Sequence, residues 1–340
     1  MDPREHLWAV VLAAGDGRRL QGLTTIRAGL AVPKQFCSLE RGPSLLQEAL
    51  QRARSVAAPE RICTIVADQH RQWWADHLEA VLPENLIVQP RNRGTANGIL
   101  LPLLEILERD PDARILLLPS DHHVRDEERL ACALRYAAFP PESAWAEILL
   151  LGLAARSADP ELGYIVPRRE AGHTHHALDR FVEKPDPGRA QRLIENGALW
   201  NAFIIAADAS ALLKLFERRY PDIVAAMRDA VRARANGSAG DAALAELYET
   251  LPELDFSRNI LQGQEQHLRV LPVPDCGWSD LGTPQRVAEA LRGLGPVTGR
   301  RAPAAFGRRV LVSLAAQQQR LGLVPGATGA ARNHEIATRA

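Results

Sequence analysis

Short apolar runs alternate with amphipathic stretches along the first half of the chain. Runs typical of strands buried on both faces cover residues 8–14, 61–67, 86–88 and 114–118. Apolar residues at helical spacing predict helices over residues 44–57, 69–81 and 95–108. Because strands that alternate with helices imply right-handed crossovers, this pattern predicts an α/β fold with a mostly parallel central sheet and helices on both faces.

The alternation is less regular in the second half of the chain. Further strands are expected over residues 147–153, 163–167, 178–182, 200–206 and 267–273. Helical patterns cover residues 187–196, 209–251 with breaks at Pro221 and 236–240, and 283–292. We expect this half to be an elaboration that closes over the sheet, and we expect the residues from about 327 onward to be mobile.

Composition narrows the function classes. Hydrophobic residues make up 46% of the chain and no run approaches the ~20 apolar residues of a membrane helix, so no membrane association is expected. Residues 1–6 lack the basic region of a signal peptide, which favours a cytoplasmic protein. The formal net charge is zero, which argues against a nucleic-acid binder because such proteins need a basic surface.

Cysteine and histidine spacing favours neither a disulfide framework nor a zinc site. The four cysteines lie far apart, at positions 37, 63, 132 and 276. The histidines at 173, 175 and 176 lie in a polar, glycine-containing stretch, where a solvated loop is the favoured interpretation over a metal site.

Only three of the 41 basic residues are lysine, Lys34, Lys184 and Lys214. A lysine retained in an arginine-rich chain suggests a position that needs a compact ammonium group, although chance is the alternative and the better one for Lys214.

Two early segments carry features of a phosphate site. Gly15 and Gly17 follow the first strand and would allow backbone N–H groups to approach an anion, with Arg19 beside them. A plain turn explains the glycines equally well. Lys34 comes shortly afterwards, held by a preceding proline, and its cation could neutralise charge on a transferring phosphate, unless it belongs to a surface turn.

Two aspartates are candidates for a magnesium site. Asp121 comes just past a buried strand, where open α/β sheets bind ligands. Asp280 lies between glycines ahead of a helix, so an N-terminal helix cap is its competing role. Because Mg²⁺ takes only one or two protein carboxylates, these two residues would suffice.

A third group of polar residues suits a phosphorylated sugar. Glu183 and Lys184 end a strand, and Asn201 opens the next one. Glu183 can accept hydrogen bonds from hydroxyl groups, Lys184 can bind a phosphate, and Asn201 can donate and accept. A surface salt bridge and a polar residue at a strand edge are the alternatives.

In chain order, these segments resemble the mannose-1-phosphate guanylyltransferases, within the wider sugar-phosphate nucleotidyltransferase family. The matching segments are 14–20 (AGDGRRL), 33–36 (PKQF), 89–98 (QPRNRGTANG), 119–122 (PSDH), 163–165 (GYI), 181–185 (FVEKP), 200–201 (WN) and 277–282 (GWSDLG). The resemblance implies a Rossmann-like nucleotidyltransferase fold with a sugar-binding elaboration. It implies one domain over residues 1–295, with a nucleotide-binding half over about 1–150 and a sugar-binding half over about 151–295. Residues 296–340 would be a partly mobile C-terminal extension.

The resemblance also implies roles for individual residues. Catalysis would fall to Arg19 and Lys34, and the metal Mg²⁺ to Asp121 and Asp280. Nucleotide binding would fall to Ala14, Gly15, Gly17, Gln89, Arg93 and Thr95. Sugar-phosphate binding would fall to Gly163, Glu183, Lys184 and Asn201.

The implied reaction joins a sugar 1-phosphate, here mannose 1-phosphate, to a nucleoside triphosphate, here GTP, and releases pyrophosphate. Because the chain ends before the isomerase domain of longer relatives, the resemblance implies a single activity. Uridylyl-, thymidylyl- or cytidylyltransfer to another phosphorylated sugar or alcohol, or a silent regulator that binds a nucleotide sugar, are the alternatives. The oligomeric state is open, a homodimer included.

The chain departs from the family pattern at positions that bear on specificity. Gln89 and Asn97 stand where the family has glutamate and proline in the segment associated with the base. Ala202 and Phe203 stand where the family has serine and glycine beside the sugar, and Arg18 replaces a threonine of the glycine loop. The departures leave both the base and the sugar open.

Overall fold

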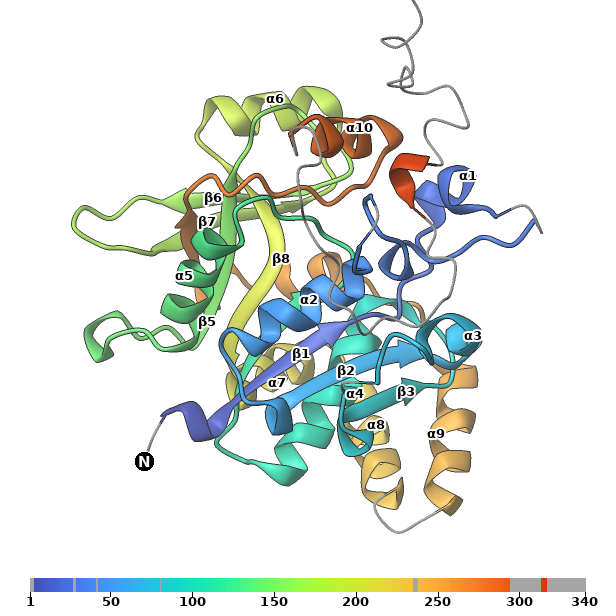
Figure 1. Ribbon diagram of the computed structural model, residues 1–340. Helices are drawn as coiled ribbons and strands as arrows, with labels where there is room; N and C mark the ends of the chain where they lie inside the picture. The colour runs from blue at the N-terminus through green and yellow to red at the C-terminus, as the bar shows by residue number, and fades with distance from the viewer. Residues whose placement is uncertain are drawn as a thin grey trace, which may run out of the picture.

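A computed structural model describes residues 3–26, 29–40, 42–79, 81–234, 238–293 and 313–316. Nine strands of the described chain form one sheet with the order β3-β2-β1-β4-β8-β5-β9-β7-β6 (Figure 1). Their bounds are β1 Leu7–Leu12, β2 Ile62–Ala67, β3 Leu86–Gln89, β4 Arg114–Pro119, β5 Ile148–Ala154, β6 Gly163–Arg168, β7 His176–Glu183, β8 Leu199–Asp208 and β9 Arg269–Val273.

The α/β fold is confirmed, but the sheet is mixed and not mostly parallel. The four strands β3, β2, β1 and β4 are parallel, as the alternation predicts. β8 then lies antiparallel between β4 and β5, and β7 is antiparallel to both β6 and β9. The connection between β6 and β7 is only seven residues long, over 169–175. Because a parallel pair needs a crossover of about a dozen residues or more, this connection permits only an antiparallel pair.

Helices cover both faces of the sheet. Their bounds are α1 Gln21–Thr24, α2 Leu45–Arg54, α3 Arg71–Trp74, α4 Gly94–Arg109, α5 Glu127–Ala138, α6 Pro187–Glu195, α7 Ala209–Arg219, α8 Pro221–Arg234, α9 Ser238–Thr250 and α10 Pro284–Gly293. Alternate residues of β1 point to opposite faces: Ala9 and Val11 pack with α2 and α5, whereas Trp8 and Val10 pack with α4 and α7. None of the helices in the described part of the chain combines the length and hydrophobicity needed to span a bilayer.

Three local features differ from the expected elements. The helix expected over 69–81 is reduced to a short turn and α3, where Trp74 Nε1 donates to the Ala67 carbonyl oxygen and ties the chain back to β2. Helix α5 had no counterpart in the pattern analysis. His175 is buried rather than solvated, because its ring contacts the Ala144 carbonyl oxygen and accepts a hydrogen bond from Arg269. Of the C-terminal extension, only residues 313–316 fall within the described ranges, and Leu314 is buried against the core.

The start of α4 holds a distant segment, residues 252–256, against the sheet. Leu254 and Ala96 donate backbone hydrogen bonds to the Arg93 and Leu254 carbonyl oxygens, respectively. Asn97 Nδ2 donates to the carbonyl oxygens of Arg93, at 2.7 Å, and Pro252, at 2.9 Å. The amide of Asn97 therefore has a structural role that a proline at this position could not fulfil.

Gly94 allows this close contact. Its φ is 83°, and a Cβ atom there would lie 2.3 Å from the Leu254 carbonyl oxygen. Gly98, one turn along the same helix, has only the Gln89 amide oxygen nearby, at 3.6 Å from such an atom. Only the first of these two glycines is required by the packing.

We expect Gly94→Ala to lower the free energy of unfolding by about 3 kcal/mol, because the new methyl group would overlap a backbone carbonyl in a strained conformation. The matched variant Gly98→Ala should gain about 0.5 kcal/mol from its better helix propensity. Urea unfolding of both variants measures the difference. Equal stabilities would contradict the close contact between α4 and Leu254.

Candidate active site

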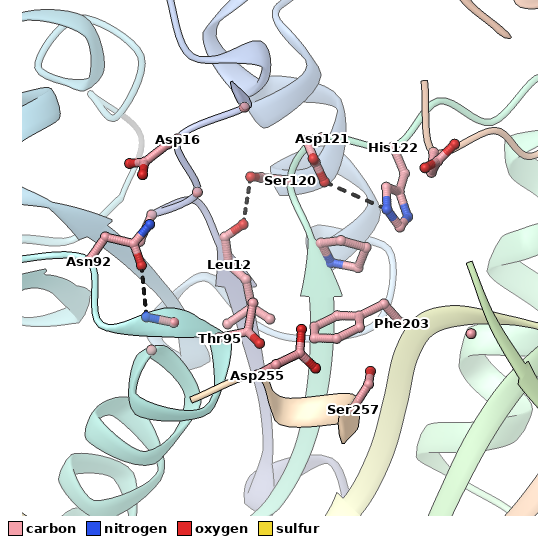
Figure 2. Close-up of a pocket in the computed structure, with 18 of the residues that line it drawn as sticks. Leu12, Asp16, Asn92, Thr95, Ser120, Asp121, His122, Phe203, Asp255 and Ser257 are labelled. Carbon is pink, nitrogen blue, oxygen red and sulfur yellow. Dashed lines mark hydrogen bonds and ion pairs between the residues drawn. The ribbon is translucent and has the colours of Figure 1, made fainter. Parts of the chain in front are cut away.

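A cavity of about 770 Å³ opens at the carboxyl ends of β1 and β4, the edge where open α/β sheets bind ligands (Figure 2). Most of the residues that the sequence assigned to the site line this cavity. They are Ala14, Gly15, Gly17, Arg19, Gln89, Thr95, Asp121, Gly163, Glu183, Lys184, Asn201 and Asp280. Lys34 and Arg93 are not among the lining residues. The structure therefore brings together one glycine turn, two aspartates and the four residues expected to bind the sugar phosphate, from widely separated segments.

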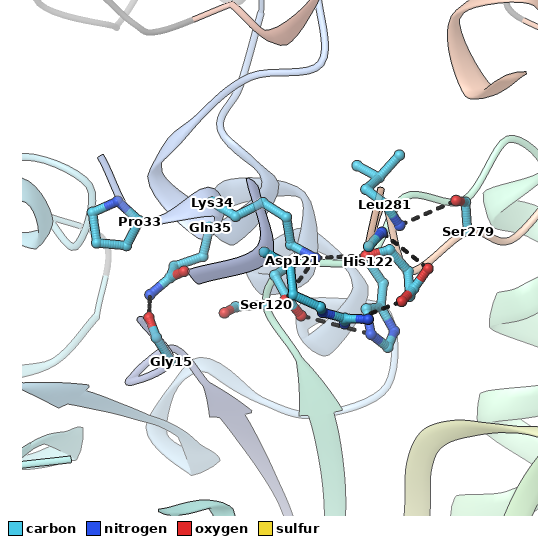
Figure 3. Close-up of polar contacts among 12 residues, drawn as sticks. Gly15, Pro33, Lys34, Gln35, Ser120, Asp121, His122, Ser279 and Leu281 are labelled. Carbon is cyan, nitrogen blue, oxygen red and sulfur yellow. Dashed lines mark hydrogen bonds and ion pairs between the residues drawn. The ribbon is translucent and has the colours of Figure 1, made fainter. Parts of the chain in front are cut away.

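The glycine turn after β1 is fixed by the segment that carries Lys34 (Figure 3). Gly17 has a φ of 62°, and a Cβ atom there would lie 2.9 Å from the Lys34 backbone nitrogen. Gln35 Nε2 donates to the carbonyl oxygens of Ala13, at 3.0 Å, and Gly15, at 2.8 Å. Gln35, which itself lines the cavity, thus fixes two carbonyl groups of the turn.

Lys34 is a buried cation and not part of a surface turn. Its ammonium nitrogen lies 2.9 Å from Asp121 Oδ2 and donates to the Asp280 carbonyl oxygen at 2.5 Å, and only 5% of its side chain is exposed. The expected role of Lys34 at a transferring phosphate stays a prediction. In the structure its ammonium group joins the two aspartate segments.

Asp121 is an ionised carboxylate. Burial alone would raise its pKa, but the charge and hydrogen bond of Lys34 outweigh burial and lower the pKa to about 2. The neighbouring His122 is neutral near pH 7, because burial lowers its pKa to about 4. Trp278 Nε1 contacts His122 Nδ1 at 3.2 Å, which leaves the proton of the ring on Nε2, 3.6 Å from Asp121 Oδ1.

A pair of backbone hydrogen bonds joins the segment of Asp280 to the segment of Asp121. His123 and Ser279 form an isolated antiparallel bridge, with both N–H···O distances at 2.9 Å. Ser120 Oγ donates to the Leu12 carbonyl oxygen at 2.6 Å and fixes the end of β4 against β1. The two aspartate segments, 159 positions apart along the chain, are therefore joined by main-chain bonds as well as by Lys34.

The carboxylate of Asp280 is held by arginine and does not cap α10. Arg286 Nη1 contacts Oδ1, and Arg19 Nη2 lies 3.4 Å from Oδ2. Thr283 Oγ1 instead accepts a hydrogen bond from the backbone N–H of Arg286, so Thr283 provides the helix cap. The helix-cap alternative for Asp280 is wrong.

Asp121 and Asp280 provide two carboxylates, a number that suits a divalent ion such as magnesium. Within the described ranges, no group of three or more His, Cys, Asp or Glu side chains could hold a metal ion. Magnesium does not need one, because it usually takes one or two carboxylates and completes its shell with water and phosphate oxygens. The ionised Asp121 carboxylate supplies the hard oxygen ligand that this ion prefers.

The side of the cavity that the sequence analysis assigned to the sugar phosphate is built around Gly163. Gly163 pairs with Glu183 across β6 and β7, and a Cβ atom on Gly163 would lie 2.6 Å from Glu183 Oε2 and 3.4 Å from Asn201 Cβ. Burial and the nearby Asp255 carboxylate raise the pKa of Glu183 to about 7, although Lys184 opposes the shift. Near neutral pH, Glu183 can therefore both donate and accept a hydrogen bond.

Three non-glycine residues with a left-handed backbone follow site residues directly or nearly so. Lys184 (φ 47°) follows Glu183, Leu281 (φ 46°) follows Asp280, and Phe203 (φ 56°) lies two residues after Asn201. Such conformations are energetically unfavourable for side chains with a Cβ atom and cluster at functional sites. Phe203, one of the departures from the family pattern, lines the cavity.

Gln89 is a buried amide without a partner. The residue is 1% exposed, lines the cavity, and neither its Oε1 nor its Nε2 makes a hydrogen bond with the described residues. An unpaired buried amide is costly unless a ligand satisfies it. This arrangement supports Gln89 as a nucleotide-binding residue.

Arg93 and Thr95 have structural roles that the sequence analysis did not foresee. The Arg93 guanidinium donates to the Tyr248 and Glu249 carbonyl oxygens, and Thr95 Oγ1 accepts from the Phe256 backbone N–H at 2.8 Å. Thr95 still lines the cavity, whereas Arg93 faces the end of α9. Arg93 therefore positions a wall of the site in this structure, and its role toward a nucleotide stays a prediction.

One lining segment escaped the sequence analysis altogether. It includes a π-helix, Phe256–Leu261, and contributes Glu253, Asp255, Ser257, Arg258 and Asn259 to the cavity. Single π-helical turns occur frequently at functional sites. Local sequence offers little signal for one, apart from Asp255, which caps it by accepting the Arg258 N–H.

The parallel half of the sheet, the glycine turn at its carboxyl edge and the paired aspartates define the class of a nucleotide-binding α/β protein. The chain belongs to the Nucleotidyl transferase family, whose sequence model matches residues 8–295.

Similar proteins include two curated relatives and one solved structure. The chain is 30% identical over 281 residues to the xanthan biosynthesis protein XanB of Xanthomonas campestris, which covers 81% of this chain and 57% of the relative. It is 30% identical over 294 residues to a mannose-1-phosphate guanylyltransferase of Salmonella muenchen, with the same coverage. The chain thus spans little more than half the length of these relatives. A crystal structure described as a mannose-1-phosphate geranyltransferase of Thermus thermophilus aligns with a TM-score of 0.69 and 27% identity, over 84% of this chain and 79% of that chain.

The raised pKa of Glu183 predicts a pH-dependent contribution to stability. Between pH 4.5 and about 7 the unfolded state releases this proton while the folded state retains it, so Glu183 destabilises the fold progressively as pH rises through that window. The free energy of unfolding of Glu183→Gln relative to wild type should therefore rise by up to about 3 kcal/mol between pH 4.5 and 8. Denaturant unfolding across this range measures it, and parallel pH profiles for the two proteins would contradict the assignment.

Proposed function

We propose that this protein is a sugar-phosphate nucleotidyltransferase that joins mannose 1-phosphate to GTP and releases pyrophosphate. The observation that carries the proposal is the single cavity in which the glycine turn, Asp121 with Asp280, and Glu183 with Asn201 meet. Its volume of about 770 Å³ lies in the range of small-molecule sites. The names of similar proteins support the mannose and guanylyl parts of the proposal.

The proposed chemistry is an in-line displacement at the α-phosphorus of the triphosphate by a phosphate oxygen of the sugar 1-phosphate. Because the attacking phosphate is already an anion, no protein nucleophile or general base is needed. The residues of the chain act by positioning and by electrostatic stabilisation. Backbone N–H groups of the glycine turn and the Arg19 guanidinium would hold the triphosphate, and Lys184 with Glu183 would orient the sugar phosphate.

Asp121 and Asp280 would hold the divalent cation, for which we propose Mg²⁺. When bound, this ion would neutralise phosphate charge and polarise the α-phosphoryl group. Lys34 acts from behind these carboxylates, so it is a positioning residue: it keeps Asp121 ionised and fixes its distance from the 280 segment.

Gln89 bears most directly on which nucleotide base the site would select. A carboxylate would select guanine, since it accepts from two adjacent donors of that base, N1–H and the N2 amino group. An amide offers one donor and one acceptor, which complements the O6 and N1–H of guanine and equally the O4 and N3–H of uracil or thymine. The buried, unpaired amide of Gln89 therefore keeps uridylyl- or thymidylyltransfer as the second candidate.

Pyrophosphate release across the four ribonucleoside triphosphates and dTTP, combined with several sugar 1-phosphates, tests the proposed function. In the same assay, Gln89→Glu should raise the ratio of kcat/KM for GTP over UTP about tenfold or more, because a carboxylate repels the uracil O4 atom. A ratio that stays at the wild-type value would exclude Gln89 from contact with the base. Absence of pyrophosphate release with every pair would refute the enzyme itself and favour a silent regulator.

Lys34→Ala should lower kcat about 100-fold while the KM for nucleotide changes by a factor of a few, because Asp121 loses the cation that orients it. Lys214→Ala is the matched control, since Lys214 is an exposed lysine on α7 far along the chain from these motifs. Steady-state kinetics of both variants decide the point. Turnover of Lys34→Ala equal to that of the control would remove Lys34 from the mechanism.

A further inference from the structure

Phe203 combines a large side chain with a backbone conformation that favours glycine. It lies in β8 where the register with β5 shifts between Leu150 and Gly152, and its φ is 56°. Asn201 Oδ1 accepts the Phe203 N–H at 3.1 Å and stabilises this irregular backbone. An aromatic residue in such a conformation points to a role for its ring, because glycine would fit the backbone better.

The ring of Phe203 is braced and cannot move aside easily. It packs edge to face against Phe256, with 6.0 Å between the ring centroids and an interplanar angle of 73°. Phe256 is fully buried and packs in turn on Phe216, at 5.7 Å between centroids. Since these contacts fix the ring from one side, its other side forms a rigid part of the cavity wall.

Polar groups surround this ring on the sugar side of the cavity. Figure 2 shows Asp255 and Ser257 beside Phe203, and both residues line the same cavity. Asn201 lines it from the strand that carries Phe203, and its Nδ2 atom lies 3.5 Å from Ser257 Oγ. An apolar ring flanked by carboxylate, hydroxyl and amide groups complements a pyranose, which has C–H faces and a rim of hydroxyl groups.

We propose that Phe203 is a specificity-determining residue for the sugar 1-phosphate. Its ring packs against a C–H face of the pyranose and occupies the space that a bulky ring substituent would need. This inference rests on the proposed function, because it assigns the wall of the same site. It adds that the wall selects unsubstituted hexose phosphates over N-acetylated ones.

The experiment compares Phe203→Ala with Phe203→Gly, since both remove the ring but only glycine relieves the left-handed backbone. Pyrophosphate release is measured with mannose 1-phosphate, glucose 1-phosphate and N-acetylglucosamine 1-phosphate. In both variants we expect the kcat/KM ratio of the N-acetylated over the unsubstituted substrates to rise roughly tenfold. The KM for hexose 1-phosphate should rise in both, while the KM for nucleotide stays constant.

Thermal unfolding provides a readout that is independent of activity. Phe203→Gly should melt about 2 °C above Phe203→Ala, because glycine adopts a positive φ without strain. Phe139→Ala, which removes a half-buried ring at the end of α5, is the control and should leave the substrate ratio unchanged. An unchanged ratio in both Phe203 variants would overturn the inference while leaving the proposed function intact. A wild-type enzyme inactive with every substrate pair would overturn both.

Discussion

The site depends on the interactions of the buried Lys34 ammonium group. It joins the carboxylate of Asp121, at the end of a central strand, to the backbone of Asp280, which comes late in the chain. A buried cation is tolerated only when its charge and its donors are satisfied, so the three residues must be in place together. The fold therefore cannot bury Lys34 without also assembling the two aspartates.

A second set of contacts holds another distant segment in the wall of the cavity, just as Lys34 holds the two aspartate segments together. Residues at the start of α4 hold the chain that leaves α9 against the sheet, through Gly94, Arg93 and Asn97. That chain then delivers Asp255 and Ser257 to the cavity. Residues at the start of α4, in the segment that the resemblance associates with the base, thus also support a wall of the cavity.

Much of this arrangement could be predicted from sequence, for physical reasons that differ between elements. The parallel strands β2 and β4 are buried throughout and mostly apolar, because both faces are covered. Asp121 was found because it follows such a strand. Helix α5 has buried residues at 130, 134 and 137, yet charged residues around its start obscured the pattern. The antiparallel insertion of β8 and the π-helix depend on tertiary pairing, which local periodicity does not encode. The hydrogen bonds of Arg93 and Lys34 to distant backbone carbonyl groups could not be predicted, because sequence spacing gives no side-chain direction.

The cations around Asp280 have a consequence for how the protein would acquire a metal. Arg286, Arg19 and Lys34 already neutralise the two aspartates in the folded chain, and Arg286 is anchored a second time by Asp159. Binding of a divalent ion would therefore displace a cationic side chain from the aspartates. The ion would not enter a site whose negative charge is unpaired. The triphosphate of the proposed reaction, with its own negative charge, would then accept a guanidinium released in that exchange.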